Sequence, residues 1–135
     1  MVRTRPVKPA IPLQDILEKD WQKQVRLLAD QLGYRRAYHT FDSRRSDTGF
    51  PDLVLVSPKR QRIIFLELKR ETGKVSDRQA EWVRDLHAAG AEVYVARPRD
   101  LQALAAVLSG RGDTEPFHVA RGHLLLELDP ILASA

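Results

Sequence analysis

Apolar residues in the first third of the chain recur at the spacing of an α-helix. From about Asp15 to Leu32 they fall on one side of a helix, and Gly33 supplies a C-terminal stop. The stripe consists of Leu17, Trp21, Val25, Leu28 and Leu32. With each residue taken as a turn of about 100°, Glu18 falls on the border of this stripe. The Glu18 side chain is therefore expected to reach the edge of the protein interior.

Two later segments also carry helical signals. Ser76 and Gln79 have the spacing of a capping box, in which each side chain accepts a hydrogen bond from a backbone N–H at the start of a helix. The helix that begins there is predicted to end at Gly90. A third helix is predicted over residues 100–108.

Short apolar runs between these helices predict strands. A β-prone segment covers residues 34–41, and the runs at 52–56 and 62–69, separated by a turn at 58–61, predict a hairpin. A strand at 92–96 follows the second helix, so the chain reaches it by a crossover. This order predicts an α/β fold with a mixed β-sheet flanked by helices.

The length of 135 residues is that of one domain with a sizeable core. Residues 1–13 are predicted to form a flexible basic arm, because prolines interrupt any helix there. Residues 14–110 form the predicted domain, and residues 111–135 a C-terminal extension. One or two short strands are expected within residues 117–128 of that extension.

Composition and charge exclude some classes of protein and favour others. The chain has 43% apolar and 30% charged residues, no apolar run long enough to span a bilayer and no pattern of a signal peptide. It has no cysteine, which excludes disulfides and thiolate zinc sites. We expect a soluble, cytoplasmic protein with no membrane partner. A net charge of +4 and a sequence pI near 9.7 favour a polyanionic partner such as nucleic acid.

Charged residues interrupt the predicted hairpin strands. Asp52 opens the first apolar run, and Glu67 and Lys69 interrupt the second. Alternate residues of a strand face the same side, so Glu67 and Lys69 project together. Burying these charges is costly unless a metal ion or a polyanionic substrate offsets the cost. Asp52 alone reads as a turn residue, and Glu67 with Lys69 alone as an ion pair, but jointly the three residues indicate a site.

Two carboxylates and an amine in this arrangement suit phosphodiester hydrolysis. That reaction needs a metal ion to neutralise charge on the phosphorus oxygens and to generate hydroxide near neutral pH. Magnesium binds few carboxylates alongside water and substrate oxygens, and Asp52 and Glu67 supply that minimum. Lys69 would then contact the attacking water or the scissile phosphate.

Basic residues around the motif are candidate contacts for nucleic acid. Arg44 and Arg45 lie in a polar loop just before it, where they would contact phosphates, and an ordinary solvated loop is an equal alternative. Lys74 follows the motif and is a candidate for the same role.

The motif resembles that of a known nuclease family. Pro51-Asp52 and Glu67-Leu68-Lys69 match the signature of the PD-(D/E)xK nucleases. A wider set of segments resembles the VRR-NUC branch, which is named for virus-type replication and repair nucleases. These segments are Gly49 to Leu53, Phe65 to Lys69, Gly73 to Ser76, Gln79 to Trp82 and Gly90 to Val95. The resemblance covers roughly residues 17–108, and the added spacing makes it more specific than the short signature.

This resemblance implies a restriction-endonuclease-like core and a deoxyribonuclease that depends on Mg²⁺ or Mn²⁺. By position, Asp52 and Glu67 resemble the metal ligands and Lys69 the catalytic lysine. Glu18 resembles the acidic residue of the first helix, a further metal ligand. Gln79 resembles an additional catalytic residue on a helix, although the capping box alone accounts for it and the two roles could coexist.

The sequence thus indicates a metal-dependent DNA endonuclease from a bacterium or phage. Branched or junction DNA is the expected target, in replication, recombination or repair, and a homodimer is expected because family members of this size tend to pair. One alternative is a non-catalytic nucleic-acid-binding module with the same fold, and another is a restriction-type endonuclease. A tRNA-splicing-type endonuclease would need a histidine-centred site, which neither His39 nor His87 visibly builds.

Overall fold

The computed structural model describes residues 11–40, 48–110 and 114–133 of the chain. In chain order the elements are η1 (Leu13–Asp15), α1 (Glu18–Gln31), β1 (Arg36–His39), β2 (Leu53–Ser57), β3 (Arg62–Leu68), α2 (Asp77–Ala88), β4 (Glu92–Ala96), η2 (Pro98–Asp100), α3 (Leu101–Ser109), α4 (Glu115–Leu126) and α5 (Asp129–Ala133). Among the helices of these ranges, none combines the length and the apolar character that a bilayer crossing requires.

The four strands form one mixed sheet in the order β1-β2-β3-β4. The first two pairs are antiparallel, and β4 runs parallel to β3 because α2 carries the chain across between them. The β2–β3 hairpin turns at residues 58–61, where the Gln61 N–H donates to the Pro58 carbonyl at 3.2 Å and Gln61 takes a φ of 54°. The predicted α/β fold, a mixed sheet flanked by helices, is confirmed.

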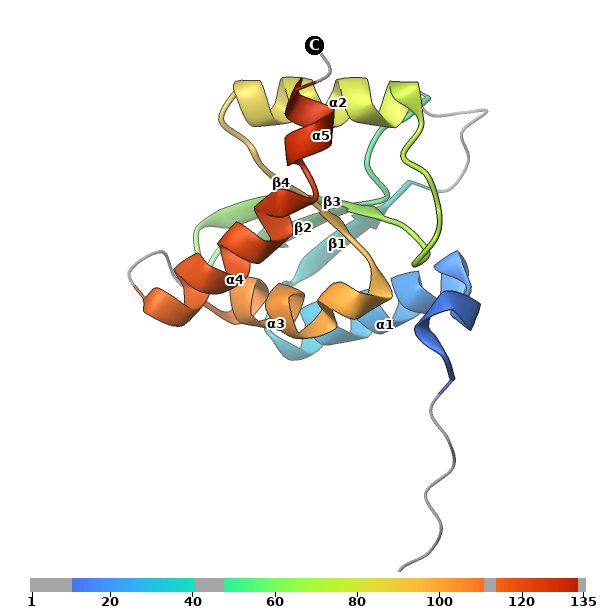
Figure 1. The fold of residues 1–135 in the computed structure, drawn as a ribbon. Coiled ribbons are helices and arrows are strands. Elements are labelled where there is room, and N and C mark those ends of the chain that lie inside the picture. The colour runs from blue at the N-terminus through green and yellow to red at the C-terminus, as the bar shows by residue number, and fades with distance from the viewer. Residues whose placement is uncertain (1–10, 41–47, 111–113, 134–135) are drawn as a thin grey trace, which may run out of the picture.

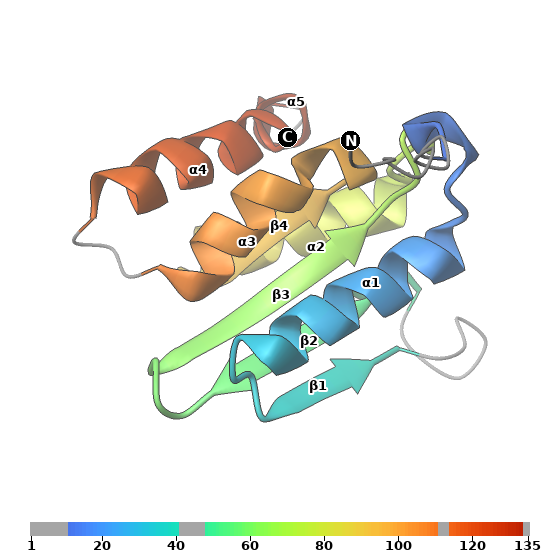
Figure 2. The same ribbon diagram turned by 90° about the horizontal axis from the view of Figure 1, so that it is seen from below.

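Helices lie on both faces of the sheet and give three layers (Figure 1). One face buries alternate residues of β2 and β3, such as Leu55 and Ile64, against α1, α3 and α4. The opposite face packs Val93 and Val95 of β4 against Val83 of α2. Figure 2 shows α1 and α3 in front of the sheet and α2 behind it.

The first helix is shorter than its apolar pattern predicts. α1 begins at Glu18 instead of about Asp15, and the single 3-10 turn η1 precedes it. Leu17 has an extended backbone with φ −71° and ψ 149° and stays exposed, so it does not join the buried stripe. That stripe begins at Trp21, whose indole N–H donates to the Ala96 carbonyl at 3.1 Å. The later start leaves Glu18 in the first turn of the helix.

The capping box predicted at the start of α2 is confirmed. Ser76 Oγ accepts the Gln79 N–H at 3.2 Å, and Gln79 Oε1 accepts the Ser76 N–H at 2.9 Å. Nearby, Gly49 has a φ of +91°, and a Cβ added there would lie 2.5 Å from the Arg78 carbonyl carbon. Because only glycine fits both conditions, Gly49 lets the loop before Asp52 pack closely on α2.

The prediction of short strands in the C-terminal extension is wrong. Residues 117–128 lie mostly in α4, and α5 follows. Phe117, Leu124 and Leu128 recur at helical spacing and are buried against the core. Gly122 is a poor helix former, but it lies on an exposed part of α4 where a Cβ would meet nothing within 4 Å. Burial of the apolar side therefore outweighs the local preference of that glycine.

We predict that α4 folds as part of the same unit as the sheet. Leu124→Ala empties a core position that is 1% exposed, and it should lower the free energy of unfolding by about 2–5 kcal/mol. Leu126→Ala on the same helix, where the side chain is 65% exposed, is the matched control and should change it by less than about 0.5 kcal/mol. Urea unfolding followed by circular dichroism measures both. Equally small effects would show that α4 folds apart from the sheet.

Candidate active site

Strand register brings two carboxylates of the predicted motif together. Leu53 of β2 pairs with Leu66 of β3, so Asp52 and Glu67 stand opposite each other at one end of the hairpin. The Asp52 Oδ2 accepts the Leu68 N–H at 2.8 Å. This hydrogen bond holds the Asp52 carboxylate against the end of β3.

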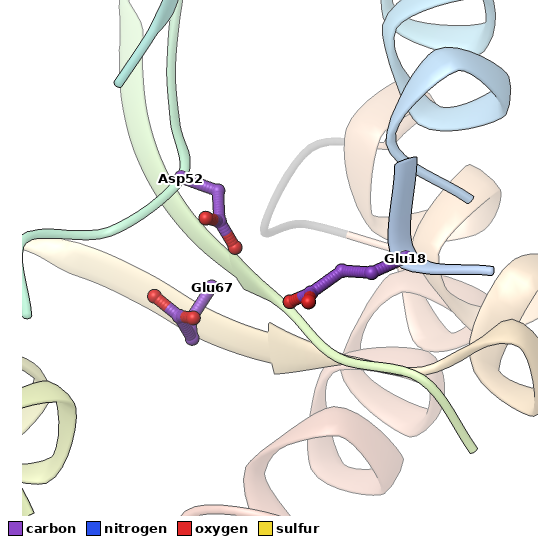
Figure 3. A group of neighbouring side chains, drawn as sticks. All are labelled: Glu18, Asp52 and Glu67. Carbon is purple, nitrogen blue, oxygen red and sulfur yellow. The ribbon is translucent and has the colours of Figure 1, made fainter. Parts of the chain in front are cut away.

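A third carboxylate reaches the same point from α1. One oxygen from each of Glu18, Asp52 and Glu67 lies within 4.8 Å of the other two. Figure 3 shows the Glu18 and Asp52 side chains pointing toward each other, with Glu67 beside them. The structure therefore brings together the three residues that were predicted as metal ligands.

Glu67 is fully buried. Its exposed fraction is 0%, and within the described ranges neither of its carboxylate oxygens has a hydrogen-bond partner. Burial, together with the charge of the nearby Asp52, raises the pKa of Glu67 to about 9. Asp100 is also buried, but it accepts the Arg97 N–H at 2.8 Å. A buried acid whose oxygens lack a hydrogen-bond partner is costly and is expected to have a ligand.

Lys69 places a positive charge beside this acid. Its Nζ lies 3.8 Å from the Glu67 Oε1, and its side chain is almost buried. The Lys69 N–H donates to the Ala96 carbonyl at 3.1 Å, which extends the pairing of β3 with β4 past the end of the strand. A separation of 3.8 Å is too long for a hydrogen bond. The ion pair therefore leaves the Glu67 oxygens unsatisfied.

The cluster fits a divalent metal ion. Three carboxylates would supply the oxygen ligands that Mg²⁺ and Mn²⁺ prefer, and a bound ion would favour the deprotonated form of each. Burial raises the pKa of Glu18 as well, although the charge of Lys69 lowers it in part. An ion bound among these oxygens would give the Glu67 carboxylate a ligand. Glu18, Asp52 and Glu67 are thus the residues that could hold it.

The other predicted site residues have different positions. The side chain of Gln79 is engaged in the capping box, so its structural role is confirmed. Lys74 is exposed in the segment between β3 and α2. Arg44 and Arg45 fall within residues 41–47, outside the described part of the chain.

A buried arginine that the sequence analysis missed holds the segment after Lys69. Arg97 Nη1 donates to the Arg70 carbonyl at 2.7 Å and to the Gly73 carbonyl at 2.6 Å. Arg97 Nε donates to Glu127 Oε1, at the end of α4, at 2.7 Å. One guanidinium thus joins the C-terminal helices to the end of β3. No local pattern identifies Arg97, because these partners lie 24 to 30 residues away in the sequence.

Arg70 is a second basic residue at the end of β3, directly after Lys69. Its Nη2 donates to the Gln14 carbonyl at 3.3 Å, while its Nε is buried and has no hydrogen-bond partner within the described ranges. The only sequence signal for Arg70 is its place directly after Lys69.

The comparison with protein families agrees with this geometry. The VRR-NUC domain family matches residues 13–100, well over half of the chain. The matched segment contains all four strands, the three clustered carboxylates and Lys69. Neither a curated protein nor a solved structure matches the chain at a significant level. On the motif, the order of the elements and this match, the chain belongs to the VRR-NUC family of nuclease domains.

Proposed function

We propose that this chain is a DNA endonuclease that depends on a divalent metal ion. One observation carries the proposal: the buried Glu67 carboxylate, which has no hydrogen-bond partner within the described ranges, lies beside the Asp52 and Glu18 carboxylates and 3.8 Å from the Lys69 Nζ. A purely structural cluster would not need to leave a buried acid without a partner. Membership of a nuclease family supports DNA as the substrate.

In the proposed reaction Glu18, Asp52 and Glu67 hold Mg²⁺ or Mn²⁺. Such an ion, when bound, neutralises charge on the phosphorus oxygens and favours the formation of hydroxide from water. The Leu68 N–H holds the Asp52 carboxylate in place. Lys69 presents its ammonium to the attacking water or the scissile phosphate, where it stabilises developing negative charge.

Contacts to the DNA backbone are proposed for Arg44, Arg45 and the exposed Lys74. Such contacts fix the position of the DNA but carry no sequence information. We therefore propose selection by DNA shape, with branched or junction DNA as the target in replication, recombination or repair. Assembly into a homodimer stays a prediction from the family resemblance.

The first test is cleavage. Asp52→Asn and Glu67→Gln should each slow cleavage roughly a hundredfold or more while DNA binding persists, because each removes a negative charge from the proposed metal site with little change in volume. Lys69→Ala should slow it by about 10²–10⁴-fold. A panel of branched, flapped, single-stranded and linear duplex DNA with Mg²⁺ or Mn²⁺ measures the rates.

Glu81→Gln is the control for these variants. Glu81 is an exposed acid on α2 that pairs with Arg78 at 3.7 Å and is not one of the three clustered carboxylates, and its substitution should leave the rates unchanged. Near-normal turnover by the Asp52 or Glu67 variant would refute the assignment. A wild-type protein that binds DNA but cuts none of the panel with either metal would instead be a non-catalytic binding module.

The second test is stability in the absence of metal. Burial raises the pKa of Glu67 from 4.5 to about 9, so between these values the folded protein keeps a proton that the unfolded chain releases, and stability falls as pH rises. Glu67→Gln removes this penalty. In EDTA at about pH 8 the variant should melt a few degrees above the wild type, and the gap should close toward pH 4.5.

Added Mg²⁺ should reverse this order. Mg²⁺ binds only the folded wild-type cluster, so it should raise the melting temperature of the wild type and leave that of Glu67→Gln nearly unchanged. Thermal unfolding across pH, with and without Mg²⁺, measures both effects. Equal pH slopes in the two proteins, or an equal response to Mg²⁺, would contradict the metal site.

The third test separates two roles of Gln79. Gln79→Glu keeps an acceptor for the Ser76 N–H and places a negative charge at a helix N-terminus, so the melting temperature should stay within a few degrees. On the catalytic role, a new carboxylate alters the charge of the site, and most activity should be lost. Wild-type cleavage by a stable Gln79→Glu protein would leave Gln79 as a helix cap only.

A further inference from the structure

The sheet face that carries Asp52 and Glu67 continues beyond them in two rows of side chains. Alternate residues of a strand share a face, and the strand register joins those of β1, β2 and β3 into rows. The near row, next to the carboxylates, is Tyr38, Val54 and Phe65, and the far row is Arg36, Val56 and Ile63. We call these six residues the strip.

Much of the strip is open to solvent. Tyr38 is 60% exposed and Ile63 is 57% exposed, while Val54 and Val56 are half-buried. The helix on this face, α2, packs on β4, at the opposite edge of the sheet from β1 (Figure 2). On the other face of the same strands Leu55 is fully buried. Phe65 is the exception, because it packs with the apolar residues on the α2 side and its ring lies edge-on to Phe50 at 6.2 Å. The described helices thus leave an apolar sheet surface uncovered over β1 and β2, beside the carboxylates.

The side chains of the strip suit the flat face of a nucleobase. Tyr38 presents an aromatic ring, the valines and Ile63 present aliphatic surface, and Arg36 adds an exposed cation at the far end. Bases stack on aromatic rings without regard to sequence, and a neighbouring cation can pair with the backbone. Bases inside a duplex are already stacked on one another, so this chemistry favours unpaired nucleotides.

We propose that the strip binds unpaired nucleotides of the DNA substrate, with one base stacked on Tyr38 beside the cleavage site. The inference rests on the proposed nuclease function. It attributes the selectivity of that nuclease for particular DNA structures to base stacking on the strip. Residues two apart in a strand are separated by about 6.6–6.8 Å, about twice the 3.4 Å rise between stacked bases. Bases on the two rows would therefore be unstacked from each other, as in an extended single strand.

A second copy of the chain is a less suitable occupant. The near row adjoins Asp52 and Glu67 on the same face, so a protein docked on the strip would crowd the approach of DNA to these residues. An unpaired strand on the strip would instead lead directly to them. The proposed enzyme therefore prefers DNA with a single-stranded segment next to the bond that it cuts.

Fluorescence anisotropy with two labelled probes tests this inference. The probes are an oligothymidylate and a blunt duplex, and Ca²⁺, which takes the same oxygen ligands, replaces Mg²⁺ so that binding is measured without relying on cleavage. Tyr38→Ala should weaken binding of the oligothymidylate about fivefold or more, the loss expected when a base loses its aromatic platform. Binding of the duplex should change less than about twofold.

Matched variants control for the fold and for exposed apolar surface in general. Tyr38→Phe keeps the ring and should bind both probes as the wild type does. Val119→Ala shortens an exposed apolar side chain on α4, away from the strip, and should affect neither probe. Melting temperatures of all three variants should match that of the wild type, because both positions are exposed.

Three outcomes would overturn the inference. The first is that Tyr38→Ala loses the same affinity for both probes. The second is that it loses affinity for neither. The third is that its affinity for oligothymidylate is unchanged while light scattering shows that the substitution converts a dimer into a monomer. The last result would assign the strip to a second copy. A Tyr38-dependent affinity for oligothymidylate in a protein that cuts no DNA would keep the inference and refute the proposed nuclease. Normal cleavage by the wild type, with no effect of Tyr38→Ala on the binding of either probe, would keep the proposed nuclease function and refute the inference about the strip.

Discussion

The antiparallel register of β2 and β3 is the constraint on which the site depends. Because side chains alternate, a slip of one residue would move Asp52 and Glu67 to opposite faces of the sheet. The fully buried Leu53 and Leu55 oppose such a slip, since it would turn them away from the core. The hydrogen bond from the Leu68 N–H to Asp52 then joins the end of the hairpin to the carboxylate cluster. The core and the site thus require the same register.

Burial of the carboxylate cluster leaves the Glu67 oxygens available to a ligand and also lowers the stability of the fold. Water would satisfy the Glu67 oxygens at the surface, but within the described ranges they have no hydrogen-bond partner at all. The ion pair with Lys69, at 3.8 Å, is too long to replace those bonds. Burying this acid lowers the free energy of unfolding, and burial of the hydrophobic core must offset that cost. Such local conflicts with packing are typical of functional sites.

The C-terminal helices take part in the architecture around the site. They lie beyond the segment that matches the family, yet Phe117 and Leu124 join the main core. Glu127, at the end of α4, pairs with Arg97, which holds the backbone that follows Lys69. The geometry around Lys69 therefore depends on residues on both sides of the family boundary.

The sequence by itself determined the features that are encoded in short, continuous stretches of the chain. The hairpin, the capping box at Ser76, the crossover to β4 and the shared side of Glu67 and Lys69 follow from periodicity and from short turns. Local pattern alone was insufficient where two signals competed, as in α4, where Gly122 and short apolar runs suggested strands but burial of a helical stripe prevailed. It also misplaced the start of α1, because the exposure of Leu17 depends on how the preceding turn packs.

Only the tertiary structure decided which distant groups come together. Glu18 was a residue on a helix border until the packing of α1 on the sheet brought its carboxylate within 4.8 Å of the other two. Arg97, its partner Glu127 and the open side of the sheet beside Tyr38 have no local sequence signal. The physical reason is that periodicity reports which side of an element is apolar, whereas these features depend on which element packs against that side and which part it leaves uncovered.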